Sequence, residues 1–211
     1  MNSKWYGAVV VGGLVLLTGC GGGGGTESAE PLTAKQVEAV LPDDAAMSGW
    51  KVSTRAAEPL PRISRAGVCG VAEEKKTPCD GLRFYSQGQY TAPDQQFSVI
   101  VSVFAAKDTD GAEPAYDELW QRVLKSGAKP EKIDSGVLGD EHDAFKSAYG
   151  RAGGPVAQIQ VRVGANVLQI TGEAAPDKEL DVDAVVDVAA VVTERAEQAG
   201  RGDSPSAALG D

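Results

Sequence analysis

Cysteine and histidine are the side chains that most often serve as nucleophiles, general bases or zinc ligands, and this chain has three cysteines and one histidine. Cys69 and Cys79 are separated by nine residues that carry charge, glycine and proline but few apolar side chains. Two thiolates and one distant histidine lack the four-ligand spacing that zinc prefers. We therefore expect a disulfide rather than a metal site. By the chain-entropy model, a disulfide that closes a loop of this size stabilises the folded protein by about 3 kcal/mol.

The single histidine, His142, lies in the acidic segment Asp140-Glu141-His142-Asp143. Such a cluster can indicate a metal site or a base that a carboxylate orients. Neighbours in sequence cannot all point at one ion, however, and one histidine without a second is a poor zinc set. A solvated turn is the interpretation that the sequence favours.

Three other patterns carry little chemistry. Asp108-Thr109-Asp110-Gly111 resembles the opening of a calcium loop, but the later ligands and the closing glutamate are missing. No Gly-x-Ser-x-Gly occurs, so a serine hydrolase has weak support. The tripeptide at 201–203, Arg-Gly-Asp, lies in a polar tail and is interpreted as chance. We therefore nominate no catalytic residue, no metal ligand and no cofactor, and expect a protein that is not an enzyme.

The N-terminus has the layout of an export signal. Lys4 supplies a positive charge, and the next 14 residues, 5–18, are all apolar or small. That run is shorter than the roughly 20 residues that span a bilayer, but it suits the apolar region of a signal peptide. It ends in Leu17-Thr18-Gly19-Cys20, which resembles the bacterial lipobox. The resemblance implies that residues 1–19 are removed and that the Cys20 thiol carries diacylglycerol, with palmitate-like chains.

The segment after Cys20 and the overall charge suggest a domain held near a membrane without lying on it. Residues 21–25 are five glycines, and with residues 26–30 they predict a flexible tether. Two acyl chains anchor stably, whereas one gives only marginal binding. The net charge is −10, and loss of Lys4 with the leader makes it −10 − 1 = −11. This acidity excludes nucleic acid as an expected partner and disfavours direct contact with anionic lipid.

The first half of the folded part predicts one helix and three strands. Residues 33–41 form a helix, with Thr33 as its cap, Gln36 at the capping-box position and Pro42 after its end. Residues 50–55 and 83–91 are strand candidates, separated by a loop at 56–82 that the disulfide would close. Residues 96–105 are a stronger strand. One face carries Phe97, Val99, Val101 and Val103, and the mixed opposite face carries Ser98, Ile100, Ser102 and Phe104.

The second half predicts two amphipathic helices and a hairpin. The first helix lies between Pro114 and Gly127, with the apolar stripe Tyr116, Leu119, Trp120, Val123 and Leu124. Weaker strands follow at 132–138 and 144–149, around the acidic turn. Residues 156–172 form a hairpin about Gly164-Ala165. Its register pairs Val163 with Asn166, Val161 with Leu168 and Ile159 with Ile170, leaving Gln158, Gln160, Arg162 and Gln169 on a face expected to be wet.

The last helix spans 181–197, with the stripe Val182, Val185, Val186, Ala189, Val192 and Ala196. This order lacks the βαβ alternation of parallel sheets. We expect an α+β fold with a single antiparallel sheet and helices packed on one face. The expected organisation is a signal peptide at 1–19, a lipidated cysteine and tether at 20–30, one domain at 31–199 and a disordered tail at 200–211.

These features together resemble actinobacterial lipoproteins. The lipobox, Leu41-Pro42 with Gly49-Trp50, the cysteine pair, the tryptophan helix and the hairpin at 161–167 are similar in layout to the extracellular sensor domains of actinobacterial receptor serine/threonine kinases. A related possibility is the PsbP/Mog1-like lipoprotein fold. Those sensor domains usually carry two disulfides, whereas this chain can form one. The resemblance implies a cleft for an unknown small ligand or an envelope protein, on the extracytoplasmic face of the cell membrane. A non-catalytic ligand-binding or sensing module is the preferred hypothesis, ahead of a protein-interaction accessory subunit and a wall-active hydrolase.

Overall fold

The computed structural model describes residues 31–54, 56–60, 77–125, 130–151 and 153–210. The signal peptide, Cys20, the glycine tether, Cys69 and Gly127 lie outside the described residues, and what the sequence predicts for them stays a prediction. Cys79, the other cysteine of the predicted pair, is fully buried in the 3-10 helix η1 (Pro78–Gly81).

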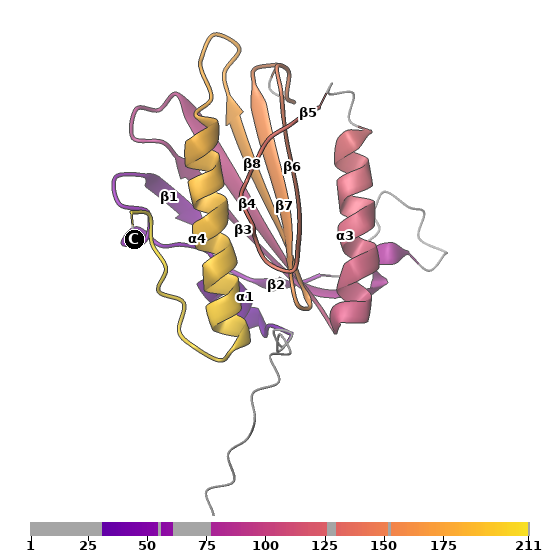
Figure 1. Ribbon diagram of the computed structural model, residues 1–211. Coiled ribbons are helices and arrows are strands. Elements are labelled where there is room, and N and C mark those ends of the chain that lie inside the picture. Colours follow the sequence, from indigo (N-terminus) through magenta and orange to yellow (C-terminus); the bar gives the residue numbers. More distant parts are fainter. Residues whose placement is uncertain (1–30, 55, 61–76, 126–129, 152, 211) are drawn as a thin grey trace, which may run out of the picture.

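A single antiparallel sheet of eight strands forms the centre of the molecule (Figure 1). The strand order is β1-β3-β4-β8-β7-β6-β5, and β2 also pairs with β3. The strands are β1 (Lys51–Thr54), β2 (Glu58–Pro59), β3 (Leu82–Thr91), β4 (Phe97–Ala106), β5 (Glu131–Lys132), β6 (Glu141–Ser147), β7 (Val156–Val163) and β8 (Asn166–Ala174). The helices in the described ranges are α1 (Ala34–Val40), α3 (Thr109–Leu124) and α4 (Val182–Gly200).

The β7–β8 hairpin has the register that the sequence predicts. Val163 lies opposite Asn166, Val161 opposite Leu168 and Ile159 opposite Ile170. Gly164 has φ +54° whereas Ala165 is not among the positive-φ residues, so the turn places its left-handed residue at the glycine. The strands that flank this hairpin, β4 and β6, extend the sheet on both sides.

Helices cover both faces of the sheet, which confirms the α+β class with one antiparallel sheet but differs from the expected one-sided packing. On the first face, α1 and α4 pack on an apolar layer that includes Val101, Ile159 and Ile170. On the second face, α3 packs through Ala115, Tyr116 and Leu119 on Phe104 and Val167. The reason is that β4 and β8 carry apolar side chains on both faces at these positions. Figure 1 shows α3 and α4 on opposite sides of the strands.

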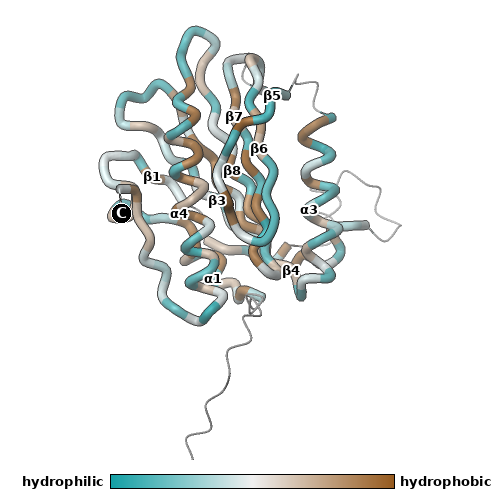
Figure 2. The backbone as a smooth tube through the Cα atoms, viewed as in Figure 1, coloured by the Kyte–Doolittle hydropathy of each residue, from teal (hydrophilic) through white to brown (hydrophobic). Residues whose placement is uncertain are grey.

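The burial of each face follows the hydropathy of its strands. The first face is almost wholly aliphatic, and its core buries the α4 residues Val185, Val188, Ala189, Val192 and Ala196. At about 25 cal/mol per Å² of apolar surface, this face is the main source of the domain's stability. Figure 2 shows the hydrophobic colours concentrated along the central strands and alternating with hydrophilic ones on α4.

Helix α1 has the predicted capping box. The Thr33 side chain accepts a hydrogen bond from the Gln36 backbone N–H, and the Gln36 side chain accepts one from Thr33 N at 3.0 Å. At its other end, the last carbonyls of α1 accept hydrogen bonds from Arg195, a buried residue of α4. Burial lowers the pKa of Arg195 below its usual value, and the nearby Asp43 opposes this shift.

Residues 201–210 return along the domain, although the sequence predicts a frayed tail there. Arg195 Nη1 donates to the Ala207 carbonyl at 3.0 Å, and Leu209 N donates to the Ala46 carbonyl at 2.9 Å. Ala207 is 6% exposed, and Leu209 packs against the core. A few small apolar residues among polar ones fix this segment, because Arg195 and Gln198 of α4 and the Ala46 carbonyl offer it hydrogen-bond partners.

Two other boundaries differ from the sequence prediction. Helix α3 begins at Thr109 rather than near Pro114, because Asp108 caps it. Strand β5 ends at Lys132, so most of 132–138 is not a strand, whereas the acidic segment predicted as a turn supplies the first residues of β6.

Candidate ligand-binding cleft

A cleft of about 840 Å³ opens on the second face of the sheet, beside the C-terminal half of α3. The closest backbone approach of α3 is at its start, where its glycine and alanine residues pack against η1. Gly111 lies against Gly81, so closely that a Cβ on Gly81 would lie 2.6 Å from the Gly111 Cα. The second half of the helix carries Trp120, Arg122 and Val123, which are not buried. The small residues at the start of α3 therefore allow close packing there, whereas the larger residues of its second half lie beside the cleft.

A row of polar side chains crosses the floor of this cleft. Gln87, Ser102, Gln169 and Gln160 are consecutive register partners on β3, β4, β8 and β7. Gln169 Nε2 donates to Gln160 Oε1 at 2.9 Å, and Gln87 Nε2 lies 3.4 Å from the Ser102 hydroxyl. The predicted wet face of the hairpin is thus only partly wet: Gln160 is fully buried, because α3 covers it.

A second row of side chains, two of them polar, runs beside the first and lines the cleft. Gln158 and Thr171 lie opposite each other on β7 and β8, and Ile100 and Phe145 continue the row on β4 and β6. Gln158 and Thr171 are half-buried and line the cleft. Neither side chain has a hydrogen-bond partner among the residues that the structure describes. The floor therefore offers an amide and a hydroxyl that are not used within the described part of the protein.

Aromatic rings border the floor at two ends. Tyr85 and Phe104 lie 5.0 Å apart between ring centroids at one end, and Trp120 and Phe145 lie 5.6 Å apart at the other. Tyr149 follows β6 at the mouth, where it is 75% exposed. Arg122, Arg151 and Glu173 also line the cleft, so its charged groups are of both signs. Trp120, which belongs to the apolar stripe predicted for this helix, packs on Phe145 and is half-buried.

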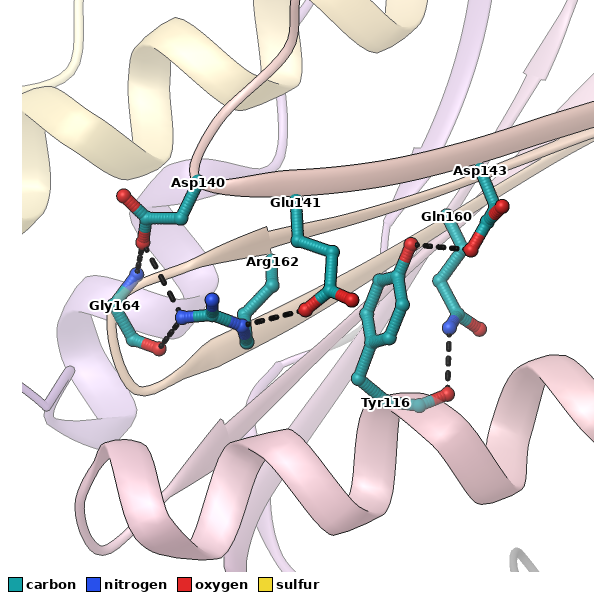
Figure 3. A network of polar contacts seen from close by, with 7 residues as sticks. All are labelled: Tyr116, Asp140, Glu141, Asp143, Gln160, Arg162 and Gly164. Atoms are coloured by element: carbon teal, nitrogen blue, oxygen red, sulfur yellow. Dashed lines mark hydrogen bonds and ion pairs between the residues drawn. The ribbon is translucent and has the colours of Figure 1, made fainter.

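A hydrogen-bond network attaches α3 to the sheet (Figure 3). Gln160 Nε2 donates to the Tyr116 carbonyl at 2.7 Å, and the Tyr116 hydroxyl donates to Asp143 Oδ2 at 3.0 Å. The Tyr116 ring is 1% exposed. Burial first, and then the charge of Asp143, raise the pKa of Tyr116 well above its ordinary value of 10.0. Tyr116 therefore stays a neutral donor at physiological pH.

The acidic segment around His142 is structural rather than a site. Arg162 bridges its first two residues, with Nε 3.2 Å from Glu141 Oε2 and Nη1 3.5 Å from Asp140 Oδ2 (Figure 3). Asp140 also accepts a hydrogen bond from Gly164 N at 2.6 Å. His142 pairs with Val161 in the β6–β7 ladder, and Val161 belongs to the first-face core, so its position is on the face opposite the cleft. The prediction of a solvated turn is wrong because these residues begin a strand.

The remaining candidate motifs have local structural roles. Asp108 Oδ1 accepts the Gly111 N–H at 2.8 Å and caps α3, which explains the resemblance of this segment to a calcium loop. The Arg201-Gly202-Asp203 segment ends α4, with Gly202 at φ +83° and Asp203 N donating to the Gln198 carbonyl. Nowhere in the described ranges do three or more potential metal-ligating side chains come together.

Tyr116→Phe tests the attachment of α3. Loss of the hydroxyl is expected to lower the free energy of unfolding by about 1 kcal/mol, since Asp143 can be rehydrated after its donor is removed. Because the folded-state pKa is raised, the stability that Tyr116 contributes is present below pH 10.0 and is lost as the pH rises beyond it. The wild type should therefore lose more stability above that pH than the variant. Urea unfolding on both sides of that pH measures this, with Tyr149→Phe as the exposed control. Equal alkaline losses in all three proteins would contradict the assignment.

Comparisons with known proteins bear on the fold. No protein-family model matches the chain, and no curated protein matches it. The extracellular domain of PknH from Mycobacterium tuberculosis aligns over 83% of this chain and 100% of its own, with a TM-score of 0.50 and 9% identity. The fold is similar to that of the PknH extracellular domain. The Rv0999 ortholog from Mycobacterium smegmatis aligns over 81% of this chain and 98% of its own, with a TM-score of 0.44 and 12% identity.

At 9% identity the PknH likeness concerns the fold alone. It agrees with the layout resemblance to kinase sensor domains that the sequence predicts, while the PsbP/Mog1-like alternative stays a prediction. Within the described ranges, no helix combines the length and hydropathy needed to cross a bilayer.

Proposed function

We propose that this protein is a non-catalytic, membrane-anchored extracytoplasmic module that binds a ligand in the cleft between α3 and the sheet. The observation that carries the proposal is the cleft itself, with its unused amide and hydroxyl groups on the floor. Binding sites are typically concave spaces of about 300–1,000 Å³ with a few polar groups among apolar ones, and this cleft has that character.

The composition of the cleft supports binding over catalysis. Its lining consists of amides, hydroxyls, aromatic and aliphatic side chains, two arginines and one glutamate. Nucleophilic or acid–base catalysis needs a base within hydrogen-bond reach of a nucleophile and a third group that orients it. His142 lies on the opposite face of the sheet, and Cys79 is buried against α3. The fold likeness to an extracellular domain further supports a location outside the cytoplasm.

Anchoring and the disulfide belong to the same proposal. The lipobox resemblance at 17–20 and the glycine-rich segment after it support attachment of the domain to the outer face of the cell membrane. A disulfide between Cys69 and Cys79 suits that compartment, because exported proteins fold under oxidising conditions. Cys79 lies at the start of the segment that Gly111 of α3 packs on, so this bond would stabilise the base of the cleft.

Filling the cleft is the direct test. Thr171→Trp places a bulky ring on the floor, and Gln89→Trp places the same ring on exposed β3 surface that does not line the cleft. A ligand present at 100 times its Kd is expected to raise Tm of the wild type and of Gln89→Trp by about 5–10 °C. It should not raise Tm of Thr171→Trp. The screen uses cell-wall peptides, lipids and sugars. A shift that survives in Thr171→Trp, or no shift with any probe, would contradict the proposal.

A second candidate is an accessory subunit that docks on an envelope protein. The feature that favours it is the exposure of two large apolar side chains in the described residues, Tyr149 at 75% and Val137 at 91%. In-cell crosslinking from these two positions would give one dominant partner under this hypothesis.

A further inference from the structure

The groups on the cleft floor indicate the chemistry of the ligand, and this inference rests on the proposed function. Five side chains on four neighbouring strands each combine hydrogen-bond donor and acceptor character: Gln158, Thr171, Gln169, Ser102 and Gln87. A primary amide presents two donors and an acceptor, and a hydroxyl presents one donor and two acceptor lone pairs. Such a surface matches a ligand whose own groups are both donors and acceptors, which describes the hydroxyls of a sugar.

The capacity of these groups is largely unused. Gln169 Nε2 is engaged by Gln160, but Gln169 Oε1, the Gln158 amide and the Thr171 hydroxyl have no partner in the described part of the chain. Gln160 is not available, because its amide donates to the Tyr116 carbonyl and accepts from Gln169. Gln160 is therefore fully engaged within the protein, whereas Gln169 Oε1 and the neighbouring Gln158–Thr171 pair are positioned by the sheet and open to a ligand.

The walls fit the apolar faces of sugar rings. Tyr85 and Phe104 line the cleft at one end of the polar floor, and Phe145, which packs on Trp120, lines it at the other. Pyranose rings have polar edges and C–H faces, so aromatic rings beside amides satisfy both. A fatty acyl chain would require a floor without unpaired polar groups, because each buried polar group left without a partner costs free energy. An extended peptide would be expected at an open strand edge, but the floor lies on four central strands.

We propose that the cleft binds an oligosaccharide, with Gln158 and Thr171 as its principal hydrogen-bonding residues. The charges at the mouth, Arg122, Arg151 and Glu173, are of both signs and do not require the glycan to be anionic.

The test uses the full lipidated chain in phosphatidylcholine nanodiscs on a glycan array that includes chitohexaose and maltohexaose, followed by calorimetric titration of the best binder. Gln158→Leu keeps the approximate size of the side chain and removes its amide. Gln158→Leu should raise the Kd for the glycan by roughly fivefold to tenfold, whereas the matched surface change Gln89→Leu should leave the Kd unchanged. Thr171→Val, which replaces the hydroxyl with a methyl group, should raise the Kd for the glycan by a similar factor. It provides a second test if Gln158→Leu misfolds.

A silent array, or glycan binding that is equal in Gln158→Leu, Thr171→Val and the wild type, would overturn the inference. The thermal-shift screen then separates the two proposals. A lipid or peptide whose effect disappears in Thr171→Trp leaves the cleft as a ligand site and removes only the glycan. Absence of any such effect removes both.

Discussion

Cys20→Ser is expected to move the protein almost completely from the membrane fraction to the soluble fraction. The thiol is the group that the lipobox resemblance predicts to be acylated, and a serine hydroxyl is a much weaker nucleophile. Burial of acyl chains contributes about 0.8 kcal/mol per CH₂, so two chains give an anchor that no other described feature can replace. The acidic chain, at net charge −10, has no electrostatic attraction to anionic lipid that would hold it there.

Fractionation with immunoblotting measures this change, and mass spectrometry of the N-terminal peptide identifies the modification. Ser28→Ala, in the predicted tether, is the matched control and should remain in the membrane fraction. Recovery in the pellet of Cys20→Ser from which residues 1–19 have been removed, or an intact Met1 with an unmodified Cys20 in the wild type, would contradict the anchoring proposal.

Arg195→Ala is expected to lower the free energy of unfolding by about 3 kcal/mol. The guanidinium is 6% exposed and donates to three carbonyls: those of Ala39 and Val40 at the end of α1, and that of Ala207 in the C-terminal segment. Helix ends leave their last carbonyls without backbone partners, so removal of this side chain leaves buried acceptors unsatisfied. It also removes one of the hydrogen bonds that fix residues 201–210 to the domain.

Urea denaturation followed by circular dichroism measures the loss, and limited proteolysis reports release of the C-terminal segment. Arg201→Ala is the control, because its ion pair with Asp203 is 3.6 Å long and both side chains are more than half exposed. Arg195→Lys keeps the charge but not the planar set of donors, and should be intermediate. If Arg195→Ala were as stable and as protease-resistant as Arg201→Ala, the three hydrogen bonds of Arg195 would contribute little free energy, which would contradict this prediction.

Elements with a strong local pattern are predictable from the sequence. The β7–β8 register follows from two aliphatic pairs, Val161–Leu168 and Ile159–Ile170, and one glycine, and the capping box of α1 follows from Thr33 and Gln36. Strand β4 follows from four alternating apolar residues. In these cases neighbouring residues alone decide the conformation, so periodicity and cap chemistry are sufficient.

The elements that sequence reasoning misplaced depend on tertiary contacts. The segment 141–143 is charged and would be expected in a turn, but Arg162 on the adjacent strand neutralises Glu141, and Tyr116 binds Asp143. The C-terminal segment is ordered by Arg195, which a helical pattern assigns to the solvent side. Neither partner is close in sequence.

The cleft was only indirectly visible in the sequence. The mixed face of β4 and the glutamines of the hairpin were recognised as lying opposite the core, but they were expected to face water. What converts that face into a lined cleft is the second-face packing of α3, which depends on the Gly81–Gly111 contact between segments 30 residues apart. The signal in the sequence is a set of side-chain amides that the strand register places on adjacent strands. Such a row predicts the polar floor of the cleft.

Native mass spectrometry of the protein released gently from the membranes that contain it tests the central claim most directly. If the cleft is a ligand site, the wild type should carry an additional bound mass that activation removes, and Thr171→Trp, isolated in the same way, should lack it while Gln89→Trp retains it. A wild-type protein of bare lipoprotein mass, or an identical adduct in Thr171→Trp, would contradict the account.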